Sequence, residues 1–85
     1  MTELNPKAAR LRNVFEKVAD KKLQPDNFGN CLMTAATENL ASKTQIAGFL
    51  GVEVEHIRKA GNSLKIREMA FVSRQIVEAY DRDHI

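Results

Sequence analysis

Apolar residues recur every three or four positions through most of this chain, which is the period of an α-helix. Asn5 and Pro6 are typical of an N-cap and a first helical position. The apolar stripe that follows consists of Ala8, Leu11, Val14, Phe15, Val18 and Ala19. Residues 23–27 contain a proline and turn-forming residues. The pattern predicts a first helix that starts at Pro6 and ends near Lys22.

Two further long helices follow from the same periodicity. One is predicted from about Pro25 to Asn39. Its apolar face consists of Phe28, Cys31, Leu32, Ala35 and Ala36. Because Cys31 lies on that face, we expect it to be a buried thiol of the core. The other is the last and longest helix, predicted from about Leu64 to Arg82.

Residues 42–62 carry local signals for two short helices. Ser42 followed three positions later by Gln45 is a capping box, which marks the start of a helix. We predict that this helix ends at Gly51, because glycine tolerates the positive φ of a tight turn. A fourth helix is predicted after the turn, ending before the Gly61–Asn62 pair.

This segment resembles the helix–turn–helix of bacterial and phage transcription regulators. Two steeply crossing helices need a small residue where they meet, which Ala47 supplies, and Gly51 suits the turn. The positions that such a unit buries are all apolar here: Ile46, Leu50, Val52, Ile57 and Ala60. We therefore predict an all-α, five-helix single domain, residues 1–85, with a helix–turn–helix at about 42–62 and a long C-terminal helix.

The resemblance implies that the second helix of the unit enters the major groove of double-stranded DNA. The residues implied to face DNA are Lys43, Thr44, Val54, Glu55, Arg58, Lys59, Asn62, Lys65 and Arg67. Arg58 would contact guanine and Glu55 a cytosine amino group, while Lys59 would contact phosphate. The implied function is that of a small sequence-specific transcriptional regulator, a repressor that acts as a homodimer.

A homodimer is implied because one such unit makes few contacts, and two copies would occupy two half-sites. The last helix also carries more apolar residues than one stripe accommodates. We expect this helix, with the first, to form the dimer interface through Met69, Phe71, Val72, Ile76 and Tyr80. Phe49 is apolar at a position that often faces solvent in such units, so we expect it in the core or in an interface.

Acidic residues favour an alternative function. Glu53 and Glu55 lie at the edge expected to meet DNA, where negative charge lowers affinity. The net charge is only +2, although residues 43–67 carry five basic and two acidic groups. The alternative is a helical protein-binding adaptor or inhibitor that uses the helix–turn–helix as a scaffold and the last helix as its docking face.

Composition limits the other function classes. The single cysteine excludes an internal disulfide and suits a reducing compartment. No apolar run reaches the ~20 residues of a membrane span and no signal peptide is visible, so we expect a cytoplasmic protein with no membrane partner. There is no nucleophile motif or phosphate loop, and His56 and His84 lack ligands at metal-binding spacing. We therefore expect no enzyme activity, no cofactor and no metal.

Overall fold

The computed structural model describes residues 5–83, and the regular secondary structure of these residues is entirely helical. The helices are α1 (Pro6–Ala19), α2 (Phe28–Thr37), α3 (Lys43–Leu50), α4 (Ile57–Asn62) and α5 (Ile66–Asp83). A short 3₁₀ turn, η1 (Val54–His56), leads directly into α4. The prediction of an all-α fold with five helices, the last of them the longest, is confirmed.

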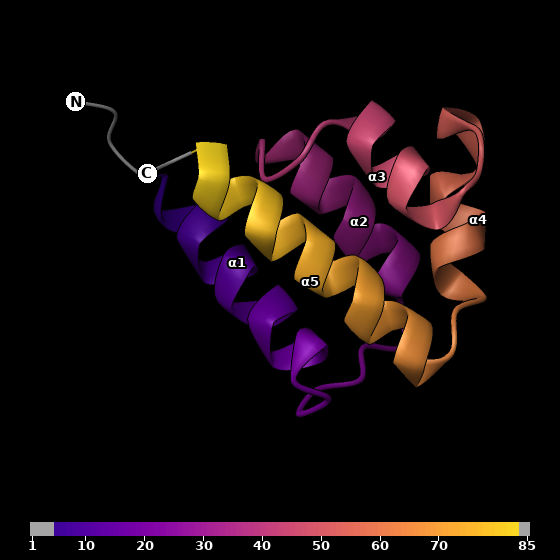
Figure 1. Ribbon diagram of the computed structural model, residues 1–85, viewed down its shortest axis with the longest axis horizontal. Coiled ribbons are helices and arrows are strands. Elements are labelled where there is room, and N and C mark those ends of the chain that lie inside the picture. Colours follow the sequence, from indigo (N-terminus) through magenta and orange to yellow (C-terminus); the bar gives the residue numbers. More distant parts are fainter. Residues whose placement is uncertain (1–4, 84–85) are drawn as a thin grey trace.

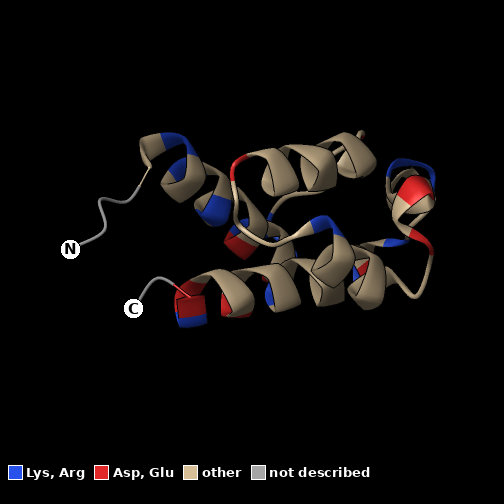
Figure 2. Cartoon of the chain, turned by 90° about the horizontal axis from the view of Figure 1, so that it is seen from above, with Lys and Arg blue, Asp and Glu red and all other residues tan. Residues whose placement is uncertain are grey.

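The first and last helices lie side by side and run in opposite directions (Figure 1). α2 lies behind α5, and α4 packs against α2. α3 contacts both α4 and α5, so it connects the two helix pairs. Seen from above, α1 and α4 lie at opposite ends of the domain (Figure 2), which measures 38 × 27 × 17 Å. None of the described helices is long and apolar enough to cross a membrane.

The predicted ends of the first two helices need correction. α1 stops at Ala19 rather than near Lys22, because Lys21 adopts a left-handed φ of 61°. α2 starts at Phe28 rather than Pro25, since the residues before it form a turn. It stops at Thr37, just before Asn39, whose φ is 62°. A residue with a left-handed φ after a helix lets the N–H groups near it bond to the last carbonyl groups of that helix. Lys21 has this conformation after α1, and Asn39 has it after α2.

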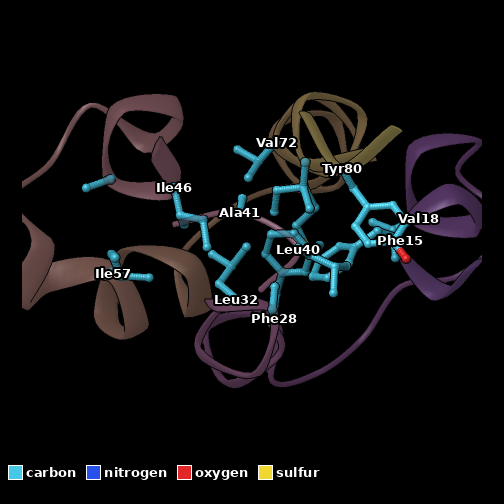
Figure 3. Packing of buried hydrophobic residues seen from close by; sticks show 14 of the residues in the cluster. Phe15, Val18, Phe28, Leu32, Leu40, Ala41, Ile46, Ile57, Val72 and Tyr80 are labelled. Atoms are coloured by element: carbon cyan, nitrogen blue, oxygen red, sulfur yellow. The ribbon is translucent and has the colours of Figure 1, made fainter. Parts of the chain in front are cut away.

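The hydrophobic core receives side chains from all five α-helices. Phe15 of α1 and Phe28 of α2 meet edge to face, with ring centroids 6.0 Å apart. The largest fully buried apolar side chains are Phe15, Phe28, Leu32, Leu40, Ile46, Ile57 and Ile76, most of which Figure 3 draws around one centre. Each large side chain of this kind contributes roughly 1.5–3 kcal/mol when buried. Cys31 is half-buried at the edge of this core, not fully buried as expected, and burial raises the pKa of its thiol.

Most of the residues predicted for a dimer interface belong to the core of a single chain. Met69, Val72, Ile76 and Tyr80 are each at most 5% exposed, whereas Phe71 is 54% exposed. The prediction is wrong for these four residues. The reason is that α1 and α3 both contact α5 and lie on either side of it (Figure 1), so they cover more than one of its faces.

Candidate nucleic-acid interface

Local interactions position the start of α3 and the turn that follows it. The Ser42 hydroxyl accepts a hydrogen bond from the Gln45 N–H at 3.0 Å, and the Gln45 side chain accepts one from the Ser42 N–H at 2.9 Å. Gly51 ends the helix with a φ of 72°. Both features occur as the sequence predicted. They place Lys43 at the first position of α3 and direct the chain toward η1 and α4.

α4 is held in place where it crosses α2 at close range, and this crossing depends on two glycines. A Cβ atom on Gly61 would lie 2.7 Å from the Gly29 Cα, and a Cβ atom on Gly29 would lie 2.0 Å from the Arg58 carbonyl oxygen. Neither position has room for a side chain. In addition, the Asn62 Oδ1 accepts a hydrogen bond from the Gly29 N–H at 2.8 Å.

The end of α4 differs from the one predicted from the sequence. Gly61 does not end the helix, which continues through Asn62; it is the point of contact with α2. No sequence signal could have identified the crossing, because residues 29 and 61 are far apart in the chain and glycine has several uses. Asn62 was predicted to contact DNA, and sequence reasoning missed its structural bond to the start of α2.

The two faces of the η1–α4 segment differ sharply. Ile57 and Gly61 are buried against the rest of the domain. The exposed residues of the segment are Val54, Glu55, His56, Arg58, Lys59 and Asn62. The buried residues therefore fix the segment, while the exposed ones present two cations, one carboxylate, an imidazole, an amide and one apolar side chain to solvent.

Six of the nine residues predicted to face DNA line one surface depression of about 620 Å³. They are Lys43, Val54, Glu55, Arg58, Lys59 and Asn62, and Met33 of α2 completes the lining. Lys43 comes from the start of α3, and the other five come from η1 and α4. The fold thus brings Lys43 next to Arg58 and Lys59, which are fifteen and sixteen positions away in the sequence.

The remaining three residues lie elsewhere. Thr44 is exposed on α3 but does not line this depression. Lys65 and Arg67 line a second depression of about 940 Å³ at the start of α5, together with Lys21 and Gln24 from the loop after α1. Lys21 was not among the predicted residues, because its place beside Lys65 results from the antiparallel packing of α1 and α5.

The cations of the first depression are not held by acidic side chains. None of the ion pairs within residues 5–83 involves Lys43, Arg58 or Lys59. Glu55 lies 3.8 Å from the His56 Nε2, a pair that is ionic only when the imidazole is protonated. The depression therefore presents three cations and one carboxylate, so its local charge is positive.

The part of the chain that the structure describes brings no three His, Cys, Asp or Glu side chains together in a way that could hold a metal ion. His84 lies outside the described residues. Comparison with known proteins found no matching protein family, curated protein or solved structure.

Proposed function

We propose that this chain binds double-stranded DNA through the depression formed by α3, η1 and α4, with these elements acting as a helix–turn–helix. One observation carries the proposal: Lys43, Arg58 and Lys59 come from two helices, yet they line the same exposed surface. Cations grouped on one exposed surface are the electrostatic feature expected of a protein that binds the phosphate backbone. The proposed role is that of a small transcriptional repressor that acts in the cytoplasm as a homodimer and occupies its operator.

The dimensions of the segment suit the major groove. An α-helix with its side chains is about 10–12 Å in diameter, which fits a groove about 12 Å wide. Arg58 would donate to guanine, Glu55 would accept from cytosine, and Val54 would contact a thymine methyl group. Lys43 and Lys59 would bind phosphate and set the orientation of the domain. Glu53 and Glu55 reduce the non-specific affinity, so a larger share of the binding energy would come from base contacts.

The alternative, a protein-binding adaptor or inhibitor, has less support. In that alternative, the last helix binds the partner through the apolar residues that exceed one helical stripe. Four residues of that helix, Met69, Val72, Ile76 and Tyr80, are at most 5% exposed, so the face offers a protein partner less apolar surface than the alternative requires. Ile66 and Phe71 are the large apolar residues of α5 that remain exposed among residues 5–83.

The test compares two double variants that remove the same charge. Arg58→Ala/Lys59→Ala removes two cations from the depression, and Lys7→Ala/Arg10→Ala removes two from α1, at the opposite end of the domain (Figure 2). Binding to a labelled generic duplex is measured by fluorescence anisotropy over a salt series. We expect the α4 variant to bind at least about tenfold more weakly and to lower the salt slope by about 1 to 2. The α1 variant should retain most of the affinity.

Two results would count against the proposal. Wild-type binding that is absent, or insensitive to salt, would exclude DNA as the partner, because phosphate contacts release counterions. Equal losses in the two double variants would mean that only net charge matters. In that case the depression would not be the binding surface.

A further inference from the structure

The outer side of α5 carries an exposed aromatic side chain beside an apolar groove. Phe71 is 54% exposed, and it lines a groove of about 260 Å³ between α5 and the end of α3. The other exposed or half-buried apolar residues of the groove are Phe49, Leu50 and Leu64, and the core residue Val72 also borders it. Arg67 and Glu68 complete its lining. An aromatic ring held at the edge of an apolar groove exposes area that water solvates poorly.

Phe71 belongs to a row of exposed residues with a distinctive order. Arg67, Phe71, Arg74 and Glu78 are all exposed, and their spacing of four, three and four residues places them in one row along α5. Ile76 and Tyr80, on the other side of the helix, are buried. We name these four residues the α5 row. Its first member is basic and its last is acidic.

This order is complementary to itself when two copies of α5 lie antiparallel. A two-fold axis between positions 72 and 73 sets position 67 opposite position 78, and position 71 opposite position 74. Arg67 then faces a glutamate at one end and Glu78 faces an arginine at the other. Each Phe71 ring faces an arginine, which favours a cation–π contact.

We propose that a second copy of this chain docks on this face, with the two α5 helices antiparallel. Arg67 pairs with Glu78 of the partner subunit, and Phe71 and the groove beside it form the apolar centre. The charge order of the row favours a second copy over an unrelated partner, because both charged ends are satisfied by the same sequence read in reverse.

The proposed dimer leaves the candidate DNA surface free. No residue of the α5 row lines the depression formed by Lys43, Arg58 and Lys59. The inference does not rest on DNA binding, since it uses only the exposure, spacing and charge of residues on α5 and the groove beside them. Self-association is therefore measured without DNA. A monomeric chain would overturn this dimer and the homodimer of the proposed function but not DNA binding by the depression, whereas a dimer that does not bind DNA would overturn only the latter.

Charge reversal provides the decisive test. Analytical ultracentrifugation compares the wild-type chain with Arg67→Glu, Glu78→Arg and the double variant at concentrations up to about 200 µM. Each single variant sets like charges against each other twice per dimer, so we expect its dissociation constant to rise at least about tenfold. The double variant restores opposite charges at both ends, and its dissociation constant should return to within about threefold of wild type.

A second pair of variants tests the apolar centre. Phe71→Ser should weaken the dimer at least about tenfold. Leu23→Ser, which removes an exposed leucine from the loop after α1, should leave the dimer unchanged. Circular dichroism of every variant establishes that the fold is retained. Because Phe71 and Leu23 are both exposed, neither change opens a cavity in the core.

Three results would overturn the proposal. The first is a wild-type chain that stays monomeric over the whole concentration range. The second is a dimer that neither single reversal weakens. The third is a double reversal that remains as weak as the single variants, since only direct pairing of positions 67 and 78 predicts rescue.

Discussion

Ser73 of α5 has no exposed surface, and its hydroxyl oxygen has no hydrogen-bond partner among residues 5–83. A buried polar group without a partner costs free energy, because it loses its bonds to water. We therefore expect Ser73→Ala to raise the free energy of unfolding by about 1 kcal/mol, measured by urea denaturation. Ser63→Ala is the comparison, since the Ser63 hydroxyl donates to the Lys59 carbonyl at 3.1 Å. It should lower stability slightly, and a loss in both variants would show that the Ser73 hydroxyl is bonded in solution.

At the same scale, interactions within one helical turn were predictable from the sequence. The Asn5 side chain accepts from the Lys7 N–H at 2.9 Å, and Ser42 and Gln45 form the expected capping box. Gly51 adopts the left-handed conformation that its turn requires. In each case both partners lie within four residues, so their meeting depends on local backbone geometry alone.

At the scale of helices, the crossing of α2 and α4 is sensitive to a single methyl group. A Cβ atom on Gly61 would meet the Gly29 Cα at 2.7 Å and the Leu32 Cδ1 at 2.8 Å. Because one of these neighbours is backbone, the two helices would have to separate. We expect Gly61→Ala to lower the free energy of unfolding by about 2 kcal/mol, within the range for overpacked cores.

Gly48→Ala is the matched control for this substitution. Gly48 also lies within a helix, α3, but a Cβ atom there would have no neighbour within 4 Å. The same change should therefore raise stability by about 0.5–1 kcal/mol, because alanine restricts the unfolded chain and favours the helix. Equal effects of the two substitutions in urea denaturation would contradict the close crossing.

Helix faces were predicted less well than helix positions. The α5 periodicity indicated a surplus of apolar residues, and the natural inference was a dimer interface. Instead α1 and α3 cover most of that surplus within one chain, and Ile66 and Phe71 remain exposed. Sequence periodicity gives the width of an apolar face but does not say whether the covering element belongs to the same chain.

At the scale of the whole molecule, an ion pair joins the first and last helices. The Arg12 Nε donates to the Asp81 Oδ1 at 3.2 Å, and the Arg12 Nη2 donates to the Asp81 Oδ2 at 2.7 Å. The hydrogen bonds from Arg12 lower the pKa of Asp81 below its usual value. A carboxylate with a lowered pKa stabilises the fold above its unfolded pKa of about 4, and the effect is lost as the pH falls through the folded pKa.

The consequence is a pH-dependent effect of Asp81→Asn. The Asp81 side chain is 46% exposed, so solvent screening limits the expected loss at pH 7 to about 0.5–1 kcal/mol. The difference from wild type should disappear as the pH approaches about 2, where the wild-type carboxylate is also neutral. Urea denaturation at several pH values checks this, with Asp26→Asn in the exposed turn before α2 as the control. A loss that is independent of pH would mean that packing, not charge, is responsible.

The sequence by itself determined the all-α class, the existence and order of the five helices and the conformations of residues such as Ser42 and Gly51. These depend on periodicity and on contacts within one turn. Only the tertiary structure decided that α4 sits on α2 through Gly29 and Gly61, and that Lys43 shares a surface with Arg58 and Lys59. It also decided which face of α5 is buried. Such features join residues that are distant in the chain, and they follow from how the helices pack rather than from where each helix begins.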